Sequence, residues 1–361
     1  MKLDYIGSIL FEPTGPLMFR GPMEFTPTVR GPQAFARTLP IPLPSTVAGC
    51  LAALMLEHGN VELPEEDKDW ERSLMKILGI DKQACLRGPY LLVENEVYVP
   101  LGEGVIKLKD LLETFNNIEA KKILSISKPL ERFFSGSIIR LKKMEYIGKG
   151  LRRSTKTVER GLLYSAEFVD YISTFHGRKV YISVDVHGQT PLSKLFDSKS
   201  YTIRLGGEGK IVRVKFKKEE YCLWKSVRGA LKKAEGGENV FVYMVNPSFI
   251  ETPIKFPNED NEQNENRKYN AFLTTTSKGK GFEFRIGSVH VRLINGRISV
   301  LGAGFDIRRK VRKPMYAAVT HGSLLLVEKG NTRVDELYYR GLSDVGGKLG
   351  YGTFIPLPII A

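Results

Sequence analysis

Cysteines and long apolar runs are scarce in this chain of 361 residues. The three cysteines, Cys50, Cys85 and Cys222, form no CxxC pair, which argues against a disulfide framework and a structural zinc site and predicts buried thiols in a reducing compartment. No apolar run reaches the roughly 18–20 residues that cross a bilayer. The first residues also lack the apolar run of a secretory signal. These absences predict a cytoplasmic protein with no membrane residence.

Motifs for catalysis are equally scarce. The five histidines form no HxxxH or HExxH pattern, and neither a Gly-x-Ser-x-Gly elbow nor a Gly-Gly-Asp-Asp run occurs. In residues 341–348 an extra glycine precedes Lys348, and Leu349 stands where a nucleotide P-loop requires Ser or Thr. We therefore predict no catalytic residue, no metal and no cofactor.

Positive charge is what the chain has in excess. Lys and Arg total 54 against 40 Asp and Glu, a net charge of +14. A surplus of this size favours a polyanionic partner, either nucleic acid or an anionic membrane surface. A generic basic surface without such a partner stays open from charge alone.

The expected elements describe an α+β fold in two halves of similar plan. Strands are predicted over 5–11, 180–186, 201–205, 210–216, 239–245, 297–301, 315–319, 323–328 and 353–360. Helices are predicted over 47–56, 191–197, 223–234 and 333–340. We divide the chain into domains 1–218 and 219–361, and expect the polar, acidic segment 257–268 to be a disordered loop.

Residues 12–45 are expected to form an extended arm, because they hold eight of the 19 prolines and proline excludes both helix and central strand. Three arginines stand along this arm with few acids: Arg20, Arg30 and Arg37. At its end, Ser45 or Thr46 is expected to cap the first helix. Gly49 inside that helix indicates close approach of a neighbouring backbone.

A basic segment, 131–160, carries nine Lys and Arg against three Glu, and predicts a protruding hairpin inserted near 131–165. Such a hairpin would neutralise several phosphates. Its candidate phosphate contacts are Arg140, Lys149, Arg152, Arg153 and Lys156. Aromatic side chains suited to stacking on unpaired bases are Phe133, Phe134, Tyr146 and Tyr164.

Two glycine-rich loops stand beside a lysine, and each precedes a predicted strand. Backbone N–H groups of such loops can bind one phosphate together. The candidate residues are Gly206, Gly207, Gly209 and Lys210 in the first loop, and Gly347 and Lys348 in the second. A tight turn would explain either loop alone, but the matching contexts favour function.

Together these segments resemble the third subunit of the Cmr complex, the type III-B CRISPR effector, within the repeat-associated RAMP superfamily. The resemblance is carried, in order along nearly the whole chain, by 16–20 (PLMFR), 39–49 (LPIPLPSTVAG), 150–164 (GLRRSTKTVERGLLY), 205–209 (LGGEG) and 350–352 (GYG).

The resemblance implies two tandem ferredoxin-like (RRM-related) domains with insertions, and no catalysis. It implies a protein that caps the 5′ repeat-derived tag of the guide RNA (crRNA), docks the large polymerase-like CRISPR subunit and adjoins the neighbouring Cmr backbone subunits. By matching position, it places Ser45, Thr46 and Gly49 beside the tag-binding groove, Gly206, Gly207 and Gly209 against RNA backbone, and Arg152, Arg153 and Lys156 on the inserted hairpin near the tag–spacer junction.

Three alternatives stay open. The first is a metal-independent endoribonuclease of the same superfamily that cuts CRISPR repeats. The second is a purely structural assembly subunit whose basic surface meets acidic proteins. The third is the equivalent subunit of a type III-A complex, which has a similar plan.

Overall fold

The structure, a computed structural model, describes residues 3–21, 35–59, 61–62, 69–80, 83–126, 128–151, 158–195, 200–218, 220–251, 282–306 and 311–357. Within these ranges, no helix is long and apolar enough to cross a membrane. The three cysteines are free and buried, as predicted, and burial raises the pKa of Cys50 to about 12.

An eight-stranded antiparallel sheet forms from strands that all precede residue 218. In spatial order these are β10 (Ser200–Arg204), β11 (Ile211–Lys217), β1 (Tyr5–Pro13), β9 (Val180–Gly188), β3 (Ala84–Val93), β4 (Glu96–Leu101), β5 (Gly104–Lys107) and β6 (Ile138–Arg140). Because side chains alternate along a strand, Ile9 and Phe11 face one core while Leu10 faces another. The first core includes side chains of α1 (Pro44–His58), α2 (Trp70–Leu78) and α7 (Leu192–Leu195).

The second core joins this sheet to elements that follow residue 222. A five-stranded sheet has the order β14 (Glu283–Ile286), β15 (Val289–Asn295), β20 (Leu324–Glu328), β12 (Asn239–Met244) and β21 (Phe354–Pro356), and a three-stranded sheet has the order β13 (Ser248–Ile250), β19 (Met315–Val319) and β16 (Ile298–Gly302). The accompanying helices are α8 (Leu223–Ala234), α10 (Val334–Arg340) and the 3-10 turn η1 (Gly347–Leu349). Three helices from the first half contribute to the same core: α3 (Leu108–Asn116), α4 (Ala120–Leu124) and α5 (Leu130–Phe133).

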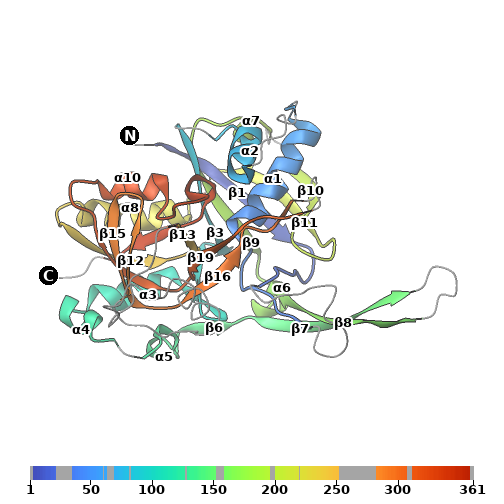
Figure 1. The fold of residues 1–361 in the computed structure, drawn as a ribbon, viewed down its shortest axis with the longest axis horizontal. Coiled ribbons are helices and arrows are strands. Elements are labelled where there is room, and N and C mark those ends of the chain that lie inside the picture. The colour runs from blue at the N-terminus through green and yellow to red at the C-terminus, as the bar shows by residue number, and fades with distance from the viewer. Residues whose placement is uncertain are drawn as a thin grey trace, which may run out of the picture.

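A long hairpin projects from the body of the protein (Figure 1). Its strands are β7 (Lys142–Leu151) and β8 (Val158–Asp170), paired antiparallel from Lys142 opposite Asp170 outwards. The short β2 (Phe35–Ala36) pairs parallel with β8. The helix α6 (Tyr171–Thr174) directly follows β8 in the chain. The hairpin thus begins later than the predicted 131–165, because residues 131–140 include the end of α5 and the strand β6. A second, short hairpin joins β17 (Phe305–Asp306) to β18 (Val311–Arg312).

The α+β class and most of the predicted elements are confirmed. The 12–45 arm differs at its start, because β1 continues to Pro13. Strands β3, β4 and β5 are absent from the predicted set. In β3 the apolar pattern is interrupted by Arg87 and a Gly-Pro pair, which hides the strand in the sequence. The domain division at 218/219 stays a prediction, and segment 257–268 lies outside the described residues.

The first helix begins differently from its prediction. Leu43 is the N-cap, and Pro44 occupies the first turn, where its missing N–H and fixed φ cost nothing. Ser45 and Thr46 therefore lie inside the helix, and neither is its cap. The prediction that a neighbouring backbone closely approaches Gly49 is also wrong, because a Cβ there would meet nothing within 4 Å.

A fully buried arginine connects the central strand β3 to the C-terminal segment. Arg87 Nε donates to the Tyr338 carbonyl in α10, and Nη1 donates to the Gly347 carbonyl in η1 at 2.8 Å and to the Leu86 carbonyl. A Cβ at Gly350 would collide with the Gly88 carbonyl, so glycine is required for η1 to lie this close to β3.

Beside Arg87 lies a buried polar cluster. The Asp185 carboxylate accepts hydrogen bonds from Ser8 Oγ (2.7 Å), Tyr90 Oη (2.6 Å) and the Trp224 N–H (2.8 Å), while burial raises its pKa to about 6. His187 is enclosed by aromatic rings, including Trp224, and its ring nitrogens have no hydrogen-bond partner among the described residues. Burial, reinforced by the charge of Arg87, lowers the pKa of His187 to about 3.

Replacing Arg87 should destabilise the whole fold. In Arg87→Met, buried carbonyls of α10 and η1 lose their donor, so the free energy of unfolding should fall by about 3 kcal/mol. Urea denaturation measures this loss. The control Arg228→Met, at an exposed position on α8, should stay within about 0.5 kcal/mol of the parent. Equal stabilities of the two variants would contradict the proposed role of Arg87.

The neutral state of His187 should make stability depend on pH. Its folded pKa lies below the unfolded value, so its contribution is complete above about pH 6.5 and is lost as pH falls toward about 3. From about pH 7 to about pH 4, the parent should lose about 3 kcal/mol relative to His187→Phe, which fits the same aromatic cage without titrating. Unfolding titrations of both proteins test this, and parallel pH profiles would contradict it.

Candidate nucleic-acid interface

The proline-rich arm folds back on itself, which brings two of its three arginines together. The Leu39 N–H donates to the Phe19 carbonyl at 2.7 Å and the Gly21 N–H to the Arg37 carbonyl at 3.0 Å. Arg20 lies opposite Thr38 in an isolated bridge, and both Arg20 and Arg37 are exposed. The third arginine, Arg30, lies outside the described residues.

The arm is bound to the base of the projecting hairpin. Leu17 and Val169 exchange two backbone hydrogen bonds, with N–O distances of 2.9 and 2.7 Å. Met18 packs in a small apolar cluster with Ala166 and Phe168 of β8. The predicted arm and the predicted hairpin therefore form one continuous surface.

The first glycine loop, between β10 and β11, lies against the same part of the arm. Its Gly207 N–H donates to the Met18 carbonyl at 2.9 Å. Gly206 has a φ of 82°, and a Cβ there would collide with that carbonyl. The Lys210 ammonium lies 4.8 Å from the centre of the Phe168 ring and 5.2 Å from that of Tyr146. These cation–π contacts connect the loop to the hairpin.

We call this surface the arm junction, and it comprises Met18, Arg20, Arg37, Tyr146, Phe168 and Gly206–Lys210. Three segments that were predicted separately from the sequence meet here: the arm, the hairpin and the first glycine loop. The hydrogen bond between Gly207 and Met18 joins residues about 190 positions apart in the chain. The Gly207 amide is already bonded to protein, so it does not serve as the predicted phosphate donor. Tyr146 keeps 41% of its side-chain surface exposed, as base stacking requires.

The first helix contributes a half-exposed strip. Thr46 and Gly49 are partly exposed, and the space beside Gly49 is open. Ser45 instead points inward, where its hydroxyl lies 2.8 Å from Tyr351 Oη and is buried. Its position fits a structural hydrogen bond rather than direct contact with a ligand.

The second glycine loop is part of the core, unlike the first. Gly347 is buried, its carbonyl accepts from Arg87, and a Cβ there would collide with the Arg340 carbonyl. Lys348 beside it is half-buried. Gly347 therefore does not present its backbone to a phosphate, because η1 uses the space for packing against β3.

The hairpin residues divide by location. Arg140 is exposed in β6, just before the hairpin, and Lys149 lies in β7, where the backbone alone is described. Arg152, Arg153 and Lys156 lie outside the described residues. Among the aromatics, Phe133 is exposed, but Phe134 is buried against Phe115 with ring centres 5.6 Å apart, so its predicted stacking role is wrong.

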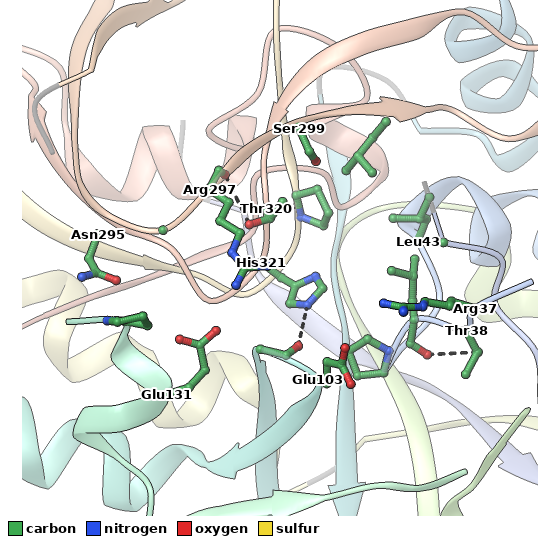
Figure 2. A pocket seen from close by; sticks show the side chains of 18 of the residues that line it. Arg37, Thr38, Leu43, Glu103, Glu131, Asn295, Arg297, Ser299, Thr320 and His321 are labelled. Atoms are coloured by element: carbon green, nitrogen blue, oxygen red, sulfur yellow. Dashed lines mark hydrogen bonds between the residues drawn. The ribbon is translucent and has the colours of Figure 1, made fainter. Parts of the chain in front are cut away.

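A cavity of about 640 Å³ opens beside Arg37. Its walls come from the arm, the β4–β5 turn, the start of α5 and the turns that follow β15 and β19 (Figure 2). Lys143 on its wall pairs with Glu103 and Glu167, each at 3.1 Å. Burial lowers the pKa of Lys143, but these two partners outweigh it, so the pKa lies above its ordinary value.

Three polar lining residues of the second half are absent from the predicted site: Arg297, Ser299 and His321. Each lies in or near a turn between strands, where its sequence context is that of any surface turn. Their convergence depends on contacts between the halves of the chain, which periodicity does not reveal. Among the described residues, no cluster of three or more His, Cys, Asp or Glu could hold a metal ion.

A family model and a curated relative both match this chain, and both are named for the Cmr3 protein. A family model described as CRISPR-associated protein (Cas_Cmr3) matches residues 9–146 and 140–358. A curated protein from Saccharolobus solfataricus, named CRISPR system CMR subunit Cmr3, is 23% identical over 327 residues, which cover 88% of this chain and 85% of that protein.

Solved structures share the fold. A chain in a cryo-EM structure of the type III-B Cmr-beta bound to cognate target RNA has a TM-score of 0.56 and 21% identity, and the match covers 88% of this chain and 86% of that chain. A second such structure, with cognate target RNA and AMPPnP, gives a TM-score of 0.55 and 20% identity with the same coverage.

Two glycines of the first loop should respond differently to a methyl group. Gly206→Ala forces a Cβ into the Met18 carbonyl at a positive φ, and should lower the free energy of unfolding by about 2 kcal/mol or more. Gly209→Ala, also at positive φ but with open space around it, should cost only about 1 kcal/mol. Chemical denaturation of both variants measures the difference, and equal losses would show that contact with the arm does not hold the loop.

Proposed function

The chain belongs to the family of the CRISPR-associated protein (Cas_Cmr3), and from this premise we propose that it is a non-catalytic RNA-binding subunit of a type III-B Cmr effector complex. Its RNA ligand is the 5′ repeat-derived tag of the crRNA. Its protein partners are the large polymerase-like subunit and the neighbouring Cmr backbone subunits. The protein acts in the cytoplasm as part of antiviral defence.

The finer architecture is part of this proposal. We infer two tandem ferredoxin-like domains, 1–218 and 219–361, with the hairpin inserted into the first. The separation of sheets supports it, since the strands of the eight-stranded sheet all precede residue 218 and those of the five-stranded sheet all follow residue 238.

The observation that carries the proposal is the convergence of basic and aromatic groups at the arm junction. Arg20 and Arg37 from the arm and Lys210 from the first glycine loop supply positive charge from two sequence-distant segments. Acidic groups lie there as well: Lys143 pairs with Glu103 and Glu167, and Glu145 and Glu208 are exposed on the hairpin and the loop. Lysine and arginine contacts to phosphates give affinity and register, while an exposed ring such as Tyr146 stacks on an unpaired base.

The direct experiment measures RNA binding and RNA integrity together. The full chain is titrated in EDTA, with and without the large subunit, against a guide RNA bearing its 5′ tag, an RNA of equal length without the tag, and a whole repeat. Tag-dependent binding with intact RNA supports the proposal. Cleavage of the repeat would identify a processing endoribonuclease instead, and large-subunit binding without any RNA affinity would identify a structural assembly protein.

Charge-removing variants should locate the phosphate contacts. Lys210→Met and Arg140→Met keep apolar stems but lose one charge each, so each should weaken tag-RNA binding and reduce the slope of log affinity against log salt by about 1. Arg228→Met, on the outer face of α8, is the matched control and should change neither quantity. Unaltered slopes in Lys210→Met and Arg140→Met would remove both residues from the site.

Gly49→Ala separates folding from binding at the first helix. The methyl group has free space and raises helix propensity, so the free energy of unfolding should rise by about 1 kcal/mol. If RNA backbone approaches Gly49, the same methyl group should weaken tag-RNA binding. A stabilised variant with parental affinity would show that α1 lies outside the groove.

A further inference from the structure

The cavity beside the arm junction has the size and lining of a small-molecule site. Its volume of about 640 Å³ lies within the range of roughly 300–1,000 Å³ that ligand pockets occupy. Apolar wall comes from Leu39, Leu43, Pro247 and Leu301, and several polar groups converge between them (Figure 2).

One of these polar groups is a histidine held in a defined state. A ring nitrogen of His321, Nε2, lies 3.2 Å from the Gly102 carbonyl, which can only accept, so Nε2 carries the proton. Burial lowers the pKa of His321 despite that hydrogen bond, so the ring is neutral. In this tautomer Nδ1 carries a lone pair that can accept a hydrogen bond.

A second polar group lacks a partner. Ser299 Oγ is shielded from water and makes no hydrogen bond within the described part of the chain, although its side chain lines the cavity. In Figure 2, Ser299 lies above His321, and Arg37 and Leu43 lie to the right of both. A shielded hydroxyl without a partner is costly, so rotation of the Ser299 side chain to bond a ligand atom in the cavity would be favourable.

The charges around the cavity favour an anion. Arg37, Arg132 and Arg297 are exposed lining residues. Together with Lys143, these arginines give the lining four cationic side chains against two acidic ones, Glu103 and Glu131. Guanidinium groups suit phosphate because they present several donors in one plane.

We propose that this cavity binds a single nucleotide, with the base between the apolar wall and His321 and the phosphate at the arginines. His321 Nδ1 accepts from a ring or exocyclic N–H of the base, and Ser299 bonds to the base or ribose. Two sources share this chemistry: a free mononucleotide, and an unpaired nucleotide of bound RNA. The second source rests on the proposed function, whereas the first does not.

The first test uses free ligands and the full chain. AMP, CMP, GMP and UMP are titrated by calorimetry, with ribose 5-phosphate and adenosine as probes that lack the base or the phosphate. At least one nucleotide should bind, and ribose 5-phosphate should bind about tenfold more weakly, since a lost hydrogen-bonded group costs about 1.4 kcal/mol. Equal binding of ribose 5-phosphate and nucleotides would indicate a phosphate site without base recognition and overturn the proposal.

Two independent variants keep this test sound if one of them folds poorly. His321→Phe preserves ring shape and removes both nitrogens, and Ser299→Leu fills the cavity without altering His321. Each should weaken nucleotide binding about tenfold or more. Arg228→Met should bind as the parent does. Parental affinity in both cavity variants, with parental melting temperatures, would overturn the proposal.

The second test asks whether the nucleotide belongs to RNA. Tagged guide RNAs with one abasic nucleotide at successive positions are bound to the parent and to His321→Phe. At one position, base removal should cost the parent about tenfold in affinity and His321→Phe almost nothing, because a shared contact makes the two losses non-additive.

The outcomes of the two tests are distinct. Mononucleotide binding without any abasic position coupled to His321 supports the free-nucleotide source, and coupling alone supports the RNA source. Failure of both overturns the nucleotide proposal, while tag binding that depends on Lys210 leaves the proposed function intact. If the cavity variants weaken only association with the large subunit, the cavity docks protein and the proposal is wrong.

Discussion

The buried guanidinium of Arg87 is the constraint on which the rest of the structure depends. A charge without access to water must be surrounded by acceptors, and here carbonyls of α10 and η1 supply them from the other half of the chain. These carbonyls can approach only because the neighbouring positions are glycines, so Gly347 and Gly350 are required for packing. This contact holds α10 and η1 against the eight-stranded sheet, beside the second core in which side chains of the two sheets pack together.

The same constraint explains why some segments that the sequence singles out lie on the surface and others lie in the core. The arm, the basic hairpin and the first glycine loop are visible in the sequence because proline content, charge and turn residues act locally. The second glycine loop has the same local signature, yet it is buried, because the partner that buries it, Arg87, lies 260 residues away from Gly347. Phe134 fails as a stacking residue for a similar reason, since its partner Phe115 belongs to another helix. The cavity residues Ser299 and His321 carry no local signal.

The resemblance to the third Cmr subunit is confirmed by the family match over nearly the whole chain, which also decides for type III-B over the type III-A equivalent. What the structure adds is the spatial relation of the parts. The hydrogen bond from Gly207 to Met18 and the position of Lys210 over two rings hold the loop against the arm and the hairpin, and two backbone bonds between Leu17 and Val169 hold the arm to the hairpin. A ligand that contacts the loop, the arm or the base of the hairpin therefore lies close to the other two.

The contacts between Arg87 and the C-terminal segment also bear on how the protein is made. The Tyr338 carbonyl that accepts from Arg87 is synthesised 251 residues after Arg87. Tyr351, the hydrogen-bond partner of Ser45, is synthesised 306 residues after Ser45. At a translation rate of about 5–20 residues per second, the nascent chain would hold β3 without its acceptors for roughly ten seconds or more. The first half is therefore expected to emerge from the ribosome before its core can close, a period in which binding by chaperones would protect it from aggregation.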